Sequence, residues 1–236
     1  MPTFTHGKSA KVFANGYEMS PYLSSFTSSG ESDTADVSTL GTNAKAYIPG
    51  MKDATFSAEG FFAKNDIDTF ASGQLGQETN WTMILSDVLG GQGFGERCIE
   101  TTYEVGAEIG GAVAVTIEGQ SVVGLERVRV LHPLAARTAT GNGSSVDNGS
   151  STSGTFALYV HVTAKSGTSS PGLFVTLQHS SDNSTWTDVA TSQQFVAANQ
   201  SQRLTATASP LYRYTRVRWT ITGTTPSFTF HASLAR

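Results

Sequence analysis

Short runs of alternating apolar and polar residues recur along the whole chain. In residues 52–62, Ala54, Phe56 and Ala58 alternate with Thr55, Ser57 and Glu59, which is the pattern of a strand with one buried face. Similar runs occupy residues 97–105, 112–121, 126–132, 156–163 and 213–222. Because turn-forming Gly, Asn, Pro and Ser residues separate these runs, the pattern predicts an all-β protein.

One stretch has the period of a helix instead. Ile67, Phe70, Ala71 and Leu75 form a single apolar stripe, preceded by Asn65 and followed by Gly76. Asn is a favoured N-cap and Gly a favoured residue after the last helical turn. We therefore expect one short helix near residues 65–75.

Two dipeptides predict turns in the first third of the chain. Asn15-Gly16 favours a tight hairpin between two short strands. Pro49-Gly50 fits the central positions of a type II turn, because proline presets φ and glycine accepts a positive φ. The polar stretch 30–34 is expected to form a loop, with short strands at 36–40 and 44–48.

Residues 138–155 mark the clearest compositional boundary. This segment is rich in Gly, Ser and Thr, and only Ala139 and Val146 are apolar, so burial cannot offset the entropy of ordering it. We expect a linker here. It would separate a β-sandwich or barrel domain with one helix, residues 1–137, from a smaller, immunoglobulin-like β-sandwich, residues 156–236.

The charge distribution agrees with two regions of different character. The chain has 236 residues and 14% charged residues; the net charge is −7 for residues 1–137 and +3 for residues 138–236. Neither region is basic enough to predict a nucleic-acid-binding face. No apolar run is long enough to span a membrane, and the N-terminus has no apolar segment of the kind that signal peptides carry. We expect no membrane partner.

The candidates for catalysis or metal binding are weak. Cys98 is the single cysteine, which excludes an internal disulfide, and its own strand offers Glu100 rather than a histidine as a base. His161, His179 and His231 lie in three different strands, but neutral surface histidines are favoured over a metal site. The glycine-rich stretch 86–95 lacks the Lys and Ser/Thr of a phosphate-binding loop. We therefore expect neither a cofactor nor an enzyme.

Two polar sets are candidates for surface functions. Glu59, Glu100, Glu104 and Glu118 are each assigned by alternation to the polar face of a long strand; this face is either simply solvated or lines an aqueous channel. The second set, with Tyr212 nearby, could bind an acidic or sugar ligand, although arginine stacking on tyrosine is also ordinary surface packing. Its members are Arg213, Tyr214, Arg216 and Arg218.

The stretch from Asp33 to Phe62 carries a family resemblance. Its Asp36, Gly41, Tyr47, Ile48-Pro49-Gly50, Asp53 and Glu59-Gly60 resemble the pattern of tail tube proteins of long-tailed bacteriophages, and the expected helix and the strands between Tyr103 and His132 continue it. The resemblance covers roughly residues 1–135. The segment after it is similar to the extra sandwich domain that such subunits often display on the outside.

The resemblance implies a structural protein of a virion, assembled in the cytoplasm of a bacterial host. Such subunits close into rings, as a rule of six, and the rings stack into a tube through which DNA passes without specific binding. Its partners would be other copies of itself and other virion proteins. An acidic inner face suits a channel for DNA because it repels the phosphate backbone. Contacts between subunits are expected at a hairpin in residues 28–47, with Glu31, Asp33, Asp36 and Lys45 as candidates.

A second role stays open from the sequence. Related sandwich folds occur in capsid decoration proteins. The chain could therefore be a decoration or adhesion protein whose C-terminal sandwich binds a glycan or another surface ligand.

Overall fold

The protein is all-β with one short α-helix, as the sequence predicts. The computed structural model describes residues 7–41, 43–64 and 66–236, and long antiparallel pairs such as β3–β4 and β11–β14 dominate these ranges. The chain forms two compact units. We call residues 22–79 and 96–125 the hairpin unit. The rest, up to Pro21, residues 80–95 and residues 126–236, is the sandwich unit.

The two units differ from the domain division expected from the sequence. Three segments that come early in the sequence belong with the C-terminal half. They are the N-terminal hairpin, the start of β6 (Gln92–Gly106) and the whole of β8 (Glu126–Arg137). They belong there because they hydrogen-bond with strands of the sandwich unit. Residues 138–155 also contribute two short strands that pair with β14, and Val146 among them is buried. These pairings join residues far apart in sequence, so no local pattern reveals them.

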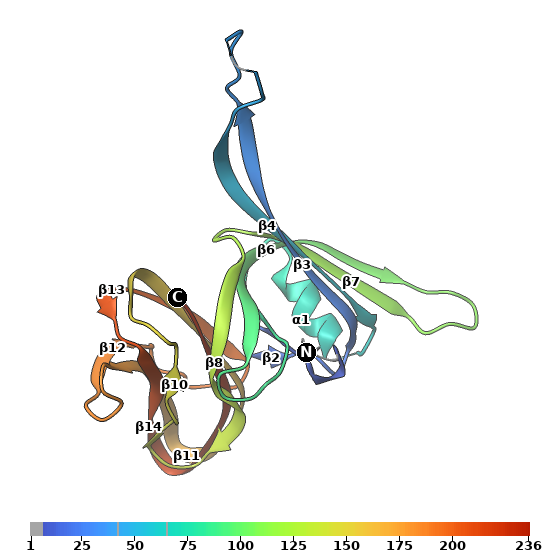
Figure 1. The fold of residues 1–236 in the computed structure, drawn as a ribbon. Helices are drawn as coiled ribbons and strands as arrows, with labels where there is room; N and C mark the ends of the chain where they lie inside the picture. The colour runs from blue at the N-terminus through green and yellow to red at the C-terminus, as the bar shows by residue number, and fades with distance from the viewer. Residues whose placement is uncertain (1–6, 42, 65) are drawn as a thin grey trace. The chain divides into compact units, whose positions relative to one another are not determined.

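Four long strands and the helix α1 build the hairpin unit (Figure 1). Their hydrogen-bonded order is β3, β4, β7, β6. The bounds are β3 Leu23–Asp36, β4 Tyr47–Phe61, α1 Ile67–Gln74, β6 Gln92–Gly106 and β7 Ala114–Ser121. As predicted, Ala54, Phe56 and Ala58 are buried on one face.

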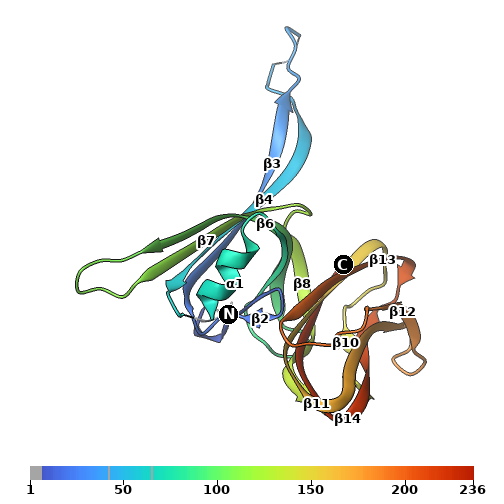
Figure 2. The same ribbon diagram turned by 180° about the vertical axis from the view of Figure 1, so that it is seen from behind.

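The β3–β4 hairpin extends further than the sequence predicts. Pro49 and Gly50 do not form a turn: they lie within β4, where Pro49 pairs with Thr34. Residues 30–34 likewise continue β3 rather than forming a loop. The extended pairing carries the tip of the hairpin away from the rest of the unit, as both views show (Figure 2). The 28–47 segment in which the resemblance places a hairpin lies within this longer one and includes its tip.

The helix α1 covers the dry face of the sheet. Ile67, Phe70 and Ala71 are buried as the apolar stripe predicts, whereas Leu75 lies beyond the helix and is exposed. The expected cap at Asn65 lies outside the described residues. The hydroxyl of Tyr103 on β6 donates a hydrogen bond to Asp68, 2.7 Å away, which ties the helix to the sheet.

The sandwich unit contains the remaining strands. They run in the order β2, β1, β5, β6, β8, β14, β11, β12, with β13 on β11 and the short β9 and β10 on β14. The short elements are η1 Gly7–Ser9, β1 Lys11–Ala14, β2 Tyr17–Glu18, β9 Gly141–Asn142, β10 Val146–Asp147 and β12 Thr187–Thr191. The longer ones are β5 Glu78–Ile84, β8 Glu126–Arg137, β11 Thr152–Ser180, β13 Gln200–Leu211 and β14 Tyr214–Ala235.

Long paired strands enclose the core of this unit. β11 and β14 pair along most of their length, with register shifts between Val162 and Gly172. Gly167 and Gly223 have positive φ in this region, a conformation that glycine adopts without strain. The core residues include Leu158, Val175 and Phe230, all fully buried. The Asn15-Gly16 turn is confirmed, since both residues have positive φ between β1 and β2.

Candidate functional site: an acidic sheet face and two projecting hairpins

The strand register of the hairpin unit gathers three of the predicted glutamates on one face. Glu59 pairs with Thr116, and Thr116 in turn pairs with Glu104. Glu118 pairs with Ser57 on β4. Because directly paired residues point to the same side of a sheet, Glu59, Glu104 and Glu118 share the face that is turned away from the buried side chains. All three are exposed.

Further polar side chains complete this acidic face. Asp53 lies on the same face of β4 and accepts a hydrogen bond from Gln120. Glu31 pairs directly with Asp53. The basic residue Arg97 lies on this face as well, because it is two residues before Ile99, which pairs with Gln120. Its guanidinium pairs with Glu78. A shallow hollow of about 310 Å³ lies on the face between Thr27 on β3 and Glu118 on β7.

Glu100 does not belong to the acidic face, so this part of the expectation is wrong. A register shift between Glu100 and Thr102 interrupts the alternation along β6. Such a bulge adds a residue to one strand and reverses the parity of everything after it. Glu100 therefore pairs with Gly119 on the covered face and is 1% exposed, while Glu104 points to the opposite side.

The buried Glu100 has an unusual environment. Neither oxygen of its carboxylate has a hydrogen-bond partner among the described residues. Burial raises the pKa of Glu100 to about 8, because a charge without partners is costly in an apolar surrounding. The nearby Glu96 is buried too, but it accepts hydrogen bonds from Ser28 and Cys98. Glu100 is thus a neutral carboxylic acid at neutral pH rather than a source of negative surface charge.

Large apolar side chains are exposed on both projecting hairpins. On β3–β4 they are Val37, Leu40, Tyr47, Ile48 and Met51. On β6–β7 they are Val105, Ile109 and Val113. Leu40 and Ile109 are fully exposed. Exposed apolar groups gathered on one feature mark sites of protein–protein contact.

The predicted contact residues lie on the first of these hairpins. Glu31, Asp33, Asp36 and Lys45 are all exposed. The amine of Lys45 is 3.9 Å from the carboxylate of Asp36. The hydrogen bonds that Asp36 accepts from Ser38 lower its pKa. The structure brings Asp36 and Lys45 together near the tip, while Glu31 lies opposite Asp53 further along the hairpin. Contact of these residues with another subunit stays a prediction.

The predicted arginine patch is a network of internal contacts. Arg213 pairs with Asp147 through two contacts of 2.6 Å, which lower the pKa of Asp147 to about 2. Arg218 pairs with Asp188 at 2.7 Å. Further contacts engage the rest of the patch: Arg213 lies 5.2 Å from the ring centroid of Tyr214, and Arg216 donates to Gln178 and lies 4.1 Å from the ring of Trp186. Binding of a glycan there stays a prediction.

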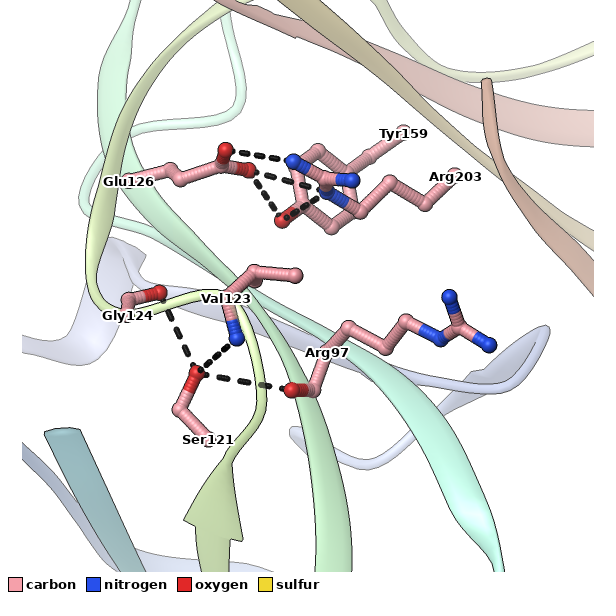
Figure 3. Close-up of polar contacts among 7 residues, drawn as sticks. All are labelled: Arg97, Ser121, Val123, Gly124, Glu126, Tyr159 and Arg203. Carbon is pink, nitrogen blue, oxygen red and sulfur yellow. Dashed lines mark hydrogen bonds and ion pairs between the residues drawn. The ribbon is translucent and has the colours of Figure 1, made fainter. Parts of the chain in front are cut away.

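A partly buried ion pair joins strands of the sandwich unit near the start of β8 (Figure 3). Arg203 contacts Glu126 through two nitrogens, at 3.0 and 2.5 Å. The hydroxyl of Tyr159 donates to the same carboxylate at 2.5 Å. In the hairpin unit, the hydroxyl of Ser121 contacts the carbonyls of Arg97 and Gly124, which shapes the loop before β8. These groups hold strands together and leave no free nucleophile.

The three histidines considered from the sequence make internal contacts. Surface positions were expected for them, but two are buried. His161 and His231 are fully buried, and both rings stack on Phe13, with ring centroids 5.6 and 4.6 Å away. His161 contacts the hydroxyl of Thr82 at 2.9 Å, and His231 contacts Asp87 at 3.1 Å. Alternation fails here because both faces of these strands are covered.

Other chemistry is missing from the described ranges. Cys98 is buried, and burial together with the charge of Glu96 raises the pKa of its thiol, so it is unsuited to nucleophilic attack. Residues 7–41, 43–64 and 66–236 contain no group of three side chains arranged to hold a metal ion. Within the same ranges, no helix is long and apolar enough to cross a membrane.

Comparisons with known proteins give matches of fold alone. No protein-family model and no curated protein matches the chain. A chain from the virion of a native gene transfer agent particle is 18% identical with a TM-score of 0.44, over 52% of this chain and 97% of the other. A chain of the SPP1 tail tube is 13% identical with a TM-score of 0.44, over 52% and 78%. SPP1 Dit, a hub protein of the adsorption apparatus, is 12% identical with a TM-score of 0.35, over 96% and 99%.

Sequence reasoning missed the exposed apolar residues of the two hairpins. Leu40 and Ile109 sit next to glycine-containing turns, where an apolar side chain has no partner within its own strand. An apolar residue at an expected turn is therefore the signal that could have identified them. Three arginines around a hollow of the sandwich unit, Arg127, Arg129 and Arg236, were also missed, because Arg236 lies far from the other two in sequence.

Proposed function

We propose that this chain is a tail tube subunit of a virion, which assembles with other copies into stacked rings around a channel that conducts DNA. The observation that carries the proposal is the two-sided sheet of the hairpin unit. One face is covered by α1 and buried, and the other displays Glu59, Glu104 and Glu118. The acidic face, rather than a pocket with reactive groups, is the chemical feature of this unit.

The charge of this face suits the wall of a DNA channel. A surface that binds DNA releases counterions through lysine and arginine contacts, which would hold the DNA in place. An acidic wall repels the phosphates and leaves DNA free to slide. Closing the β3–β4–β7–β6 sheets of several copies into a ring would place these carboxylates on its inner surface.

The projecting hairpins supply the surfaces for assembly. A single copy leaves Leu40, Met51 and Ile109 in water, at a cost of roughly 1.5–3 kcal/mol each relative to full burial. Contacts between neighbouring subunits and between rings would cover them. The solved tail tube and gene transfer agent chains belong to assemblies of this kind, but the proposal rests on the sheet and the hairpins of this chain.

Negative-stain electron microscopy of the purified protein at increasing concentration tests the proposal. We expect hollow stacked rings, and native mass spectrometry should give a single ring number. A variant that carries Leu40→Ser and Met51→Ser should stay monomeric and folded, as judged by its circular dichroism. A wild-type protein that remains monomeric at every concentration, or that coats capsids without forming rings, would contradict the proposal.

A further inference from the structure

The sandwich unit has a hollow with an unbalanced positive charge. It has a volume of about 390 Å³, and its lining includes the side chains of Arg127, Arg129 and Arg236. Neither aspartate nor glutamate belongs to this lining. Burial lowers the pKa of Arg236, and the charge of Arg129 lowers it further. We call this hollow the arginine pocket.

The strand register explains how the arginines come together. Arg127 pairs with Phe94 on β6, and Arg129 pairs with Leu234 on β14. Paired residues share a face, so each guanidinium stands beside an apolar side chain. Leu85 adds a third apolar group to the lining. The arginine pocket therefore fits an occupant that carries both an apolar group and a negative charge.

Internal hydrogen bonds position two of the arginines without neutralising them. Arg129 donates to the carbonyl of Asp147 at 3.1 Å and to the side-chain oxygen of Asn148 at 3.4 Å. Arg236 donates to the carbonyl of Ser150 at 2.7 Å. These acceptors are neutral carbonyl and amide oxygens. The carboxylate of Asp147 pairs with Arg213, although its charge also acts on Arg129. An incoming carboxylate would form charge-assisted hydrogen bonds, which are roughly twice as strong as neutral ones.

The tip of the β6–β7 hairpin has the complementary chemistry. Residues 101–117 contain two exposed glutamates, Glu104 and Glu108, and no lysine or arginine. At the tip, Glu108 precedes the fully exposed Ile109, and Gly110 with positive φ closes the turn. The β3–β4 tip fits less well, because it carries Lys45 beside Asp36.

We propose that the arginine pocket of one copy binds the β6–β7 tip of a second copy. Ile109 fills the apolar part beside Phe94 and Leu234, and the carboxylate of Glu108 pairs with Arg127 and Arg129. This inference rests on the proposed function, since it names one contact through which the subunits assemble. The contact joins two different surfaces and is therefore heterologous, the kind that generates rings or stacks.

Charge reversal tests the contact. Glu108→Arg alone, and Arg127→Glu with Arg129→Glu, should each raise the protein concentration needed for half-maximal assembly at least about 10-fold, measured by sedimentation. A chain carrying all three substitutions should assemble at nearly the wild-type concentration, because the charges are then exchanged rather than lost. Lys64→Glu, an exposed reversal outside both surfaces, should have no effect.

Cross-linking gives a second, independent readout. In a Cys98→Ser background, a chain that carries both Glu108→Cys and Arg127→Cys should form disulfides between copies under mild oxidation of assembled protein, seen as a ladder of dimers and larger species on a non-reducing gel. If wild-type protein forms rings while Glu108→Arg assembles equally well, the docking is wrong and the tail tube proposal stands. A disulfide within one chain also overturns the docking. A wild-type protein that never assembles overturns both.

Discussion

Glu100 is the residue for which the sequence-based prediction and the structure differ most clearly. Simple alternation assigns it to the same side as Glu104, but the bulge in β6 turns it onto the covered face. A bulge depends on the register of the partner strand β7, which the sequence of β6 does not contain. Glu59, Glu104 and Glu118 lie on the exposed face, as alternation predicts. The pairing of β4 with β7, the strands of Glu59 and Glu118, has no register shift, and β6 has none after Thr102.

The buried carboxyl of Glu100 makes stability depend on pH. Its pKa is about 8 in the folded state and near 4.3 in an unfolded chain. The folded state therefore holds this proton more tightly, and the contribution of Glu100 to stability is lost as pH rises from about 4 to 8. Glu100→Gln should remove this dependence, so that its stability relative to wild type increases by on the order of 3 kcal/mol across that window.

Urea unfolding at both ends of the window measures this effect. Glu104→Gln is the matched control, because Glu104 lies on the same strand but is exposed, and it should change the unfolding free energy by less than about 0.5 kcal/mol at either pH. Equal slopes of stability against pH for wild type and Glu100→Gln would show that Glu100 is not held neutral in the folded protein.

Gly119 is a second residue on which the hairpin unit depends. A Cβ added there would lie 2.2 Å from the ring of Phe56 and 2.8 Å from the carbonyl oxygen of Ile99. Gly119→Ala should therefore lower the free energy of unfolding by about 2 kcal/mol, through overpacking beneath α1. Gly106→Ala, where nothing lies within 4 Å, should be nearly neutral. Thermal unfolding by circular dichroism compares the two; equal melting temperatures would contradict the packing of Phe56 against β7.

At the scale of elements, local patterns predicted what depends on local sequence. The helix, the Asn15-Gly16 hairpin and the buried side of β4 follow from periodicity and turn chemistry. The length of the β3–β4 hairpin does not, because Pro49-Gly50 has the chemistry of a turn and becomes part of β4 only through pairing with β3. The two strands of residues 138–155 likewise form because β14 offers an edge to pair with.

The β3–β4 hairpin should contribute to assembly without contributing to the fold of a single chain. Leu40→Ser and Met51→Ser each remove an exposed apolar side chain, so the melting temperature of the monomer should not change. Each should raise the concentration for assembly by about 10-fold, the equivalent of a contact worth about 1.4 kcal/mol. Light scattering against concentration measures this. Val196→Ser is the matched control, because it also removes an exposed apolar side chain, but from the sandwich unit. It should leave the concentration for assembly unchanged.

The acidic face should act on DNA rather than on assembly. Replacing Glu59, Glu104 and Glu118 together by lysine keeps their exposed positions and reverses the charge. The variant should still form rings, while particles that contain it should deliver DNA poorly because the channel would bind phosphates. The matched triple glutamine variant should deliver DNA at close to the wild-type level. Normal delivery by the lysine variant would show that this face does not line the channel.

At the scale of the whole molecule, the chain combines two β units with different chemistry. The hairpin unit supplies an acidic sheet and two apolar tips, and the sandwich unit supplies a packed core and the arginine pocket. The opposite net charges of the two halves of the sequence reflect this division in part. The division is not a single boundary, however, because the chain passes between the two units several times.

Cryo-electron microscopy of the assembled protein tests the central claim most directly. The account predicts a hollow tube of stacked rings in which the β3–β4–β7–β6 sheets of neighbouring copies form the inner wall, with Glu59, Glu104 and Glu118 facing the channel and Glu100 inside the subunit. A reconstruction in which this face points outward, or in which the subunits form no channel, would contradict it.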